Sequence, residues 1–195
     1  MVYHEDFSDR RSGWPDQDYP GTDAHYIAGG YKLSRLAPGR ASVPAVEGLI
    51  AVAADTIAAY GPWWGNFHAS MRLEAYWRRP DAAVGMVFDV MERGYYAFLL
   101  AAPGDAREMA FELVKGRWDG TRSTIIPRTP IAQEERPGKA HKLSVERNRG
   151  QIILAVDDRQ VGSIQDTTFE YGLVGIGVFK ESHVIVRDLL VQAIR

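Results

Sequence analysis

Apolar and polar residues alternate along most of this chain with a period of two. The clearest run extends from Phe67 to Trp77, where every second residue is apolar and the residues between them carry polar groups. Side chains of a strand point alternately to its two faces, so this run predicts a half-buried β-strand. Further strands are predicted at 84–90, 95–101, 109–113, 143–145, 151–156, 161–164, 173–179 and 184–194, with one more leading toward Ile126.

Short turn signals separate the predicted strands. Arg93-Gly94, Asn148-Arg149-Gly150 and Asp157-Asp158 are typical of tight turns, because Gly, Asn and Asp tolerate the backbone conformations that such turns require. The strongest helical signal is the alanine-rich segment Ala51 to Tyr60, which predicts either one helical turn or the end of a strand. Loops are expected at 8–22, 37–44, 61–65 and 126–138.

Many short strands with almost no helix are typical of a β-sandwich or a barrel. About a dozen strands exceed the number in an immunoglobulin-type sandwich and favour a larger jelly roll. No segment is long and polar enough for a domain linker, so one domain over residues 1–195 is predicted. The residues expected between its two sheets are Phe67, Met71, Leu73, Met86, Phe88, Val145, Leu154, Ile176 and Val178.

Composition narrows the functional classes. The 195 residues are 46% hydrophobic and 25% charged, as in a globular protein, and the absence of cysteine excludes disulfides, cysteine nucleophiles and cysteine-based metal sites. A net charge of −2 argues against a nucleic-acid partner, and no apolar run is long enough to predict a membrane span. The first residues lack the basic and apolar regions of a signal peptide. This predicts a cytoplasmic protein, or an extracytoplasmic one if the chain is cut from a longer precursor.

Short motifs with a fixed order and spacing cover nearly the whole chain. They are D-F-S-D at 6–9, S-G-W at 12–14, Y-x-x-G-x-Y-x-L at 26–33, G-x-x-F at 85–88 before Y-Y-x-F at 95–98, and G-x-V-G-I at 172–176 before R-D-L-L-V at 187–191. In this order they resemble the bacterial, laminin G-like jelly-roll domains of the concanavalin A-like lectin/glucanase superfamily, although Asp89 stands where that family usually has arginine. The resemblance implies two stacked antiparallel sheets, one of them curved. It does not imply one function, because members include sugar-binding modules, adhesion domains and glycoside hydrolases.

Three carboxylates are the candidate catalytic groups. Retaining and inverting glycosidases need two carboxylates roughly 5–10 Å apart. Glu74, Asp89 and Glu112 occupy polar positions of successive predicted strands, so they could share one sheet face with His68 and Arg72. The favoured alternative is a solvated face with cross-strand charge pairs. The dense E-x-D-x-x-E strand of the superfamily's glucanases does not occur in this sequence, which argues against hydrolysis.

The segment from Tyr60 to Asn66 carries the strongest binding signal. Its Trp63 and Trp64 lie between glycine and proline residues in a predicted loop. The apolar faces of sugar rings stack on indole and phenol rings, while sugar hydroxyls need polar neighbours. The alternative is that one of the two tryptophans closes an end of the sandwich. The predicted ligand-binding residues are Tyr60, Trp63, Trp64, Asn66, His68 and Arg72.

Loop aspartates are the candidate metal ligands. Ca²⁺ binds carboxylate and carbonyl oxygens on loops, and Asp16, Asp18 and Asp23 lie in a segment that also contains Gly and Pro. Asp157-Asp158 is a second candidate, although aspartate is expected there for the turn itself. No EF-hand spacing occurs. The predicted function requires no cofactor, and Ca²⁺ is an optional ligand.

The combined interpretation is a non-catalytic binding module for carbohydrate or a glycan-bearing surface. Such a module could form part of a larger multidomain protein. Two alternatives stay open. One is a glycoside-processing enzyme with carboxylates on the curved sheet, and the other is a protein–protein interaction domain.

Overall fold

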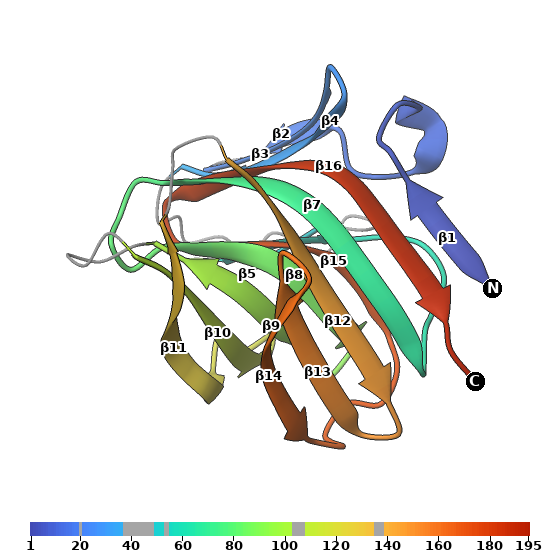
Figure 1. Ribbon diagram of the computed structural model, residues 1–195. Coiled ribbons are helices and arrows are strands. Elements are labelled where there is room, and N and C mark those ends of the chain that lie inside the picture. Colours follow the sequence, from blue (N-terminus) through green and yellow to red (C-terminus); the bar gives the residue numbers. More distant parts are fainter. Residues whose placement is uncertain (20, 37–48, 53–54, 103–107, 135–138) are drawn as a thin grey trace.

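Two antiparallel sheets lie over one another in the computed structural model (Figure 1). The structure describes residues 1–19, 21–36, 49–52, 55–102, 108–134 and 139–195. Nearly all regular structure in these ranges is strand, and one short 3₁₀ helix spans Arg10–Ser12. None of the described helices is long and apolar enough to cross a membrane. The arrangement is the jelly-roll β-sandwich that the strand pattern predicts.

The nine-stranded sheet follows the order β14-β13-β12-β7-β16-β4-β3-β2, and β1 pairs with β16. In Figure 1 its long central strands β7, β12 and β16 arch over the second sheet. Its strands are β1 Val2–Glu5, β2 Gln17–Tyr19, β3 Thr22–Ile27, β4 Gly30–Arg35, β7 Phe67–Trp77, β12 Ala140–Asn148, β13 Gln151–Val156, β14 Arg159–Gln165 and β16 Ser182–Ala193.

The seven-stranded sheet follows the order β11-β10-β9-β8-β15-β6-β5. Its strands are β5 Leu49–Val52, β6 Asp55–Ala59, β8 Ala83–Met91, β9 Gly94–Ala101, β10 Glu108–Gly116, β11 Arg122–Glu134 and β15 Leu173–Phe179. The chain crosses between the two sheets several times. Residues that are far apart in the sequence therefore become neighbours at the ends of the sandwich.

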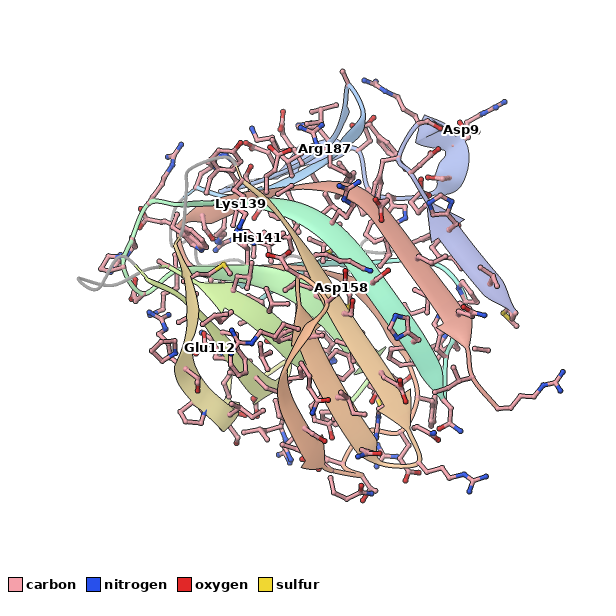
Figure 2. The ribbon with its side chains drawn as sticks, in the orientation of Figure 1. Asp9, Glu112, Lys139, His141, Asp158 and Arg187 are labelled. Atoms are coloured by element: carbon pink, nitrogen blue, oxygen red, sulfur yellow. The ribbon has the colours of Figure 1, made fainter. Side chains whose placement is uncertain are left out.

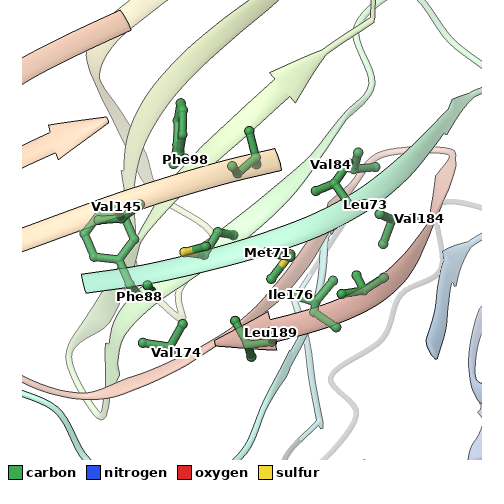
Figure 3. Close-up of a cluster of buried hydrophobic side chains, with 14 of the residues drawn as sticks. Met71, Leu73, Val84, Phe88, Phe98, Val145, Val174, Ile176, Val184 and Leu189 are labelled. Carbon is green, nitrogen blue, oxygen red and sulfur yellow. The ribbon is translucent and has the colours of Figure 1, made fainter. Parts of the chain in front are cut away.

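The main core lies between the two sheets, as the period of two predicts. All nine residues expected there have no exposed surface. Figure 3 shows several of them in contact across the interior, among them Met71 and Leu73 from β7, Phe88 from β8 and Val145 from β12. Because alternate side chains of β7 face inward, His68 and Arg72 lie on the outer face of this sheet.

The seven-stranded sheet has a second apolar cluster on its other face. Val87, Tyr95, Ala97 and Leu99 belong to this cluster, whereas the residues between them on β8 and β9 point into the main core. A strand that is buried on both faces reads as a continuous apolar run. This explains why the segment from Gly94 to Ala101 shows little polar alternation in the sequence.

Three local expectations need correction or resolution. The predicted loop over 8–22 is wrong in part, because it contains the 3₁₀ helix Arg10–Ser12 and strand β2 Gln17–Tyr19. The predicted loop over 126–138 is wrong for much of its length, because β11 continues to Glu134 in pairing with β10. The ambiguous segment Ala51 to Tyr60 is extended and belongs to β5 and β6. The predicted loop at 37–44 lies outside the described residues.

The two predicted hairpin turns after β12 and β13 are confirmed. Arg149 and Gly150 have φ values of 48° and 86°, and Asp157 and Asp158 have values of 48° and 64°. Consecutive positive φ values give the backbone twist that joins two antiparallel strands through a two-residue turn. These turns set the register of the β12–β13–β14 ribbon.

Candidate functional site

The two tryptophans in the loop between β6 and β7 differ in burial. Trp63 is 56% exposed, whereas Trp64 is 4% exposed and belongs to the main core. The backbone of Trp64 donates a hydrogen bond to the Gly172 carbonyl at 2.9 Å and accepts one from the Gly172 amide at 3.0 Å. A side chain at position 172 would collide with the Asp89 backbone, since an ideal Cβ there lies 2.5 Å from the Asp89 carbonyl carbon. Because Trp64 is buried in the main core, in the loop that joins β6 of one sheet to β7 of the other, it closes one end of the sandwich.

The bond pair between Trp64 and Gly172 places two aromatic rings side by side. Tyr171 is 50% exposed, and its ring centroid lies 5.7 Å from that of Trp63 with an interplanar angle of 40°. We call Trp63 and Tyr171 the aromatic patch. Sequence analysis missed Tyr171, because the residue lies far from Trp63 along the chain. Its position directly before the G-x-V-G-I motif is the one sequence signal that could have drawn attention to it.

Tyr60 and Asn66 hold the two ends of this loop. The Tyr60 ring covers Gly13, where an added Cβ would lie 2.3 Å from the ring and φ is +98°. The Asn66 side-chain oxygen accepts a hydrogen bond from the Arg149 amide at 3.0 Å. Both predicted binding residues thus contact neighbouring segments at the two ends of the loop.

The structure places the other two predicted ligand-binding residues on the outer face of β7. His68 is half-buried and pairs in register with Glu146 on one side and Gln192 on the other. Arg72 is exposed and lines a groove to which neither member of the aromatic patch contributes. The six predicted residues therefore do not form one site.

The three candidate catalytic carboxylates do not share a sheet face, so that expectation is wrong. Glu74 lies on the outer face of the nine-stranded sheet, where Arg187 donates to it at 2.9 Å. Glu112 lies on the seven-stranded sheet, 4.0 Å from Arg128. Figure 2 shows Arg187 and Glu112 in well-separated parts of the molecule. Glu74 and Glu112 thus belong to separate charge pairs.

Asp89, the third carboxylate, is fully buried between the sheets. Its Oδ2 accepts a hydrogen bond from Arg147 Nε at 3.0 Å, and the two side chains are 0% and 2% exposed. Burial raises the pKa of Asp89 to about 7, against the opposing effect of Arg147. Arg147 also donates to the Phe169 carbonyl. The pair joins β8, β12 and the segment before β15, so Asp89 has a structural position rather than an accessible one.

The aspartates predicted to bind calcium contact a histidine. His25 lies between Asp16 and Asp18, with ring nitrogens 3.1 Å and 2.6 Å from their carboxylate oxygens. Asp23 pairs with Asp18 in the β2–β3 ladder. Within the described ranges there is no group of three or more His, Asp or Glu side chains that could hold a metal ion. Calcium binding at these residues stays a prediction.

A pH titration tests whether these carboxylates pair with His25 or bind Ca²⁺. Asp18, followed by Asp16, raises the pKa of His25 above its ordinary value of 6.5. The stabilising contribution of His25 is therefore fully present below pH 6.5 and is lost as the pH rises through the raised pKa. We expect NMR titration to show this pKa and Asp18→Asn to reduce it. If Ca²⁺ binds here, millimolar Ca²⁺ must lower the His25 pKa, and EDTA must lower the melting temperature of the protein as isolated.

Comparison with known proteins finds solved structures with a similar fold. No family model and no curated protein matches the sequence. The carbohydrate-binding module CBM66 from Bacillus subtilis is 14% identical, with a TM-score of 0.61 over 90% of each chain. The β-glucanase of Bacillus licheniformis is 8% identical, with a TM-score of 0.64 over 100% of this chain and 98% of the other. A protein of unknown function with a galectin-like fold from Bacillus subtilis is 9% identical, with a TM-score of 0.66 over 97% and 94%. Together with the two stacked antiparallel sheets, these likenesses show that the chain has the jelly-roll β-sandwich fold.

Proposed function

We propose that this chain is a non-catalytic binding module that takes carbohydrate on the aromatic patch. The observation that carries the proposal is the exposure of Trp63 and Tyr171, two rings brought together from distant segments. Adjacent exposed rings offer a flat apolar surface to the C–H face of a sugar. Exposing two large aromatic side chains to water is unfavourable unless they serve an interaction.

The construction of the patch also supports binding. The reciprocal backbone bonds between Trp64 and Gly172 fix the two segments that carry the rings. A surface that is ordered before the ligand arrives loses less entropy on binding. The names of two structural neighbours, a carbohydrate-binding module and a β-glucanase, are consistent with a carbohydrate ligand.

Binding is favoured over glycoside processing by the positions of the carboxylates. Glu74 and Glu112 lie on different sheets, and Asp89 is enclosed with Arg147. Hydrolysis by the two known routes needs two carboxylates on either side of one glycosidic bond. These three residues do not provide that arrangement.

Truncating the patch should weaken glycan binding without unfolding the protein. A ring that stacks on a ligand contributes about 1 kcal/mol, so Trp63→Ala and Tyr171→Ala should each lower the affinity roughly five- to tenfold. Tyr171→Phe keeps the ring and should bind nearly as the natural protein does. A glycan array identifies the ligand, and isothermal titration calorimetry with that glycan measures each variant.

Tyr76→Ala is the matched control, because it removes a ring from the outer face of β7, outside the patch. Its affinity for the glycan should be unchanged. If no glycan on the array binds, or if Trp63→Ala binds as tightly as the natural protein, the patch is not a carbohydrate site. Loss of a protein partner in Trp63→Ala, with no glycan bound by the natural protein, would instead favour an interaction domain.

A further inference from the structure

A groove lies on the outer face of the nine-stranded sheet. Its volume is about 560 Å³, within the range of about 300–1,000 Å³ that small-molecule sites occupy. β7 forms its floor, β12 and β16 flank it, and the turn between β13 and β14 lies along one side. The lining residues that matter here are Ser70, Arg72, Lys142, Asp158, Asp188 and Leu190.

The charged groups on the β12 side of the groove already have hydrogen-bond partners. Lys142 Nζ donates to Asp158 Oδ1 at 2.8 Å. Asp157 Oδ1 accepts a hydrogen bond from the Lys142 backbone amide at 2.8 Å. The other oxygen of Asp157, Oδ2, lies 2.9 Å from His141 Nδ1. Asp158 and His141 are labelled in Figure 2 beside β12. This side of the groove is an ordered polar wall whose charges already have partners.

Arg72 and Asp188, by contrast, have no partner among the residues that the structure describes. They are register neighbours on β7 and β16, yet their side chains form no ion pair within 4 Å and no hydrogen bond. On its other side Arg72 faces Lys142, a second cation. Opposite charges on neighbouring strands normally pair, and like charges opposite each other repel. Among the described residues that line the groove, Arg72 is thus an unpaired cation and Asp188 an unpaired carboxylate, whereas Lys142 is already paired with Asp158.

Small side chains create the space between these charges. Ser70 is 7% exposed, and its register neighbours are Ser144 on β12, also 7% exposed, and Leu190 on β16. Ser70 leaves room above the sheet, and the half-buried Leu190 adds an apolar surface. A ring-shaped ligand with polar edges matches this floor.

We propose that the groove binds a sugar acid of the uronic acid class. A guanidinium fork binds a carboxylate through two parallel hydrogen bonds, so Arg72 takes the ligand carboxylate. An ionised carboxylate only accepts hydrogen bonds, so Asp188 takes ligand hydroxyl groups. A free amino acid would offer an ammonium group to Asp188 but would leave the floor of Ser70 and Leu190 uncovered. The inference does not rest on the aromatic patch.

Calorimetry with digalacturonate, neutral galactobiose and glutamate tests the proposal on the full chain. Digalacturonate should bind at least tenfold more tightly than galactobiose, and glutamate should bind more weakly still. Arg72→Gln should lower the affinity for digalacturonate at least tenfold, because it removes a charge-assisted bidentate contact. Its melting temperature should stay near that of the natural protein, since Arg72 is exposed and unpaired.

Two control variants make the result specific. Arg78→Gln removes an exposed arginine just beyond the end of β7, outside the groove, and should leave digalacturonate binding unchanged. Trp63→Ala should also leave it unchanged, whatever the variant does to neutral glycans. Asp188→Asn should weaken binding, because the amide replaces one of the two acceptor oxygens of the carboxylate with a donor.

Four results would each overturn the assignment. They are no binding of digalacturonate, equal binding of digalacturonate and galactobiose, tighter binding of glutamate, and unchanged binding in Arg72→Gln. If Trp63→Ala abolishes digalacturonate binding and Arg72→Gln does not, the acid binds at the aromatic patch and the groove proposal is wrong. Failure of the patch as a neutral glycan site would show only in the Trp63 and Tyr171 variants.

Discussion

Replacing Asp89 with alanine should lower the free energy of unfolding at pH 8 by about 3–5 kcal/mol. The reason is that the variant leaves Arg147 as a buried charge without its carboxylate partner. The Arg147 side chain is 2% exposed, and its Nε donates to Asp89 at 3.0 Å. Urea denaturation of the natural protein and the variant measures the difference. A loss below about 1 kcal/mol, the size typical of an exposed pair, would contradict the buried position of the pair.

The double variant Asp89→Leu with Arg147→Met is the matched control. It removes both charges and replaces them with apolar side chains. Replacing both members of a buried pair is often neutral or even stabilising, so the double variant should be more stable than Asp89→Ala. Glycan affinity per folded molecule should be unchanged in all of these variants, because Asp89 has no exposed surface. Loss of a hydrolytic activity in Asp89→Asn with intact folding would contradict the structural role.

The same carboxyl group should make stability depend on pH. Burial raises the folded-state pKa of Asp89 from 3.8 to about 7. The folded state then binds more protons than the unfolded state between these values. The stabilisation that comes from this difference in proton binding is fully present below about pH 4 and is lost as the pH rises through about 7. Asp89→Asn cannot titrate at this position, so its stability should decline less between pH 4 and pH 8.

The second large effect concerns Trp64. Trp64→Ala should lower the free energy of unfolding by about 3–5 kcal/mol, because truncating a buried tryptophan loses apolar burial and leaves a cavity. Trp63→Ala, one residue away, should change it by less than about 0.5 kcal/mol, because that indole is mostly exposed. Denaturant unfolding of the two variants under identical conditions measures the contrast.

The Trp64 variants also separate stability from binding. Trp64→Phe keeps part of the buried ring and should lie between Trp64→Ala and the natural protein in stability. In a folded sample, Trp64→Ala should disturb glycan binding through the altered loop, whereas Trp63→Ala should weaken binding roughly five- to tenfold at full stability. Equal destabilisation by Trp63→Ala and Trp64→Ala would mean that both indoles close the sandwich, and the aromatic patch would lose its role.

Sequence alone determined much of the fold, because strand formation and burial leave a local signature. Alternation of apolar and polar residues is set by the two faces of each strand, so it can be read without knowing which strands pair. The run from Phe67 to Trp77 matches β7 at both ends. Positive-φ turns likewise depend on a few consecutive residues, as at Asp157-Asp158. The loop prediction over 126–138 was wrong as far as Glu134, because bulges in β11 interrupt the alternation of apolar and polar residues.

Only the tertiary structure decided how the candidate residues combine. Alternation predicts which face a side chain takes within one strand, but not which strands lie beside each other or in which register. Trp63 meets Tyr171 because Trp64 pairs with Gly172, and Asp89 meets Arg147 because β8 and β12 face each other across the core. These contacts join residues far apart in the chain, so no local pattern encodes them. The sequence predicted that Trp63 and Trp64 share one loop. Which indole is buried and which is exposed depends on packing against distant segments, so only the tertiary structure decided it.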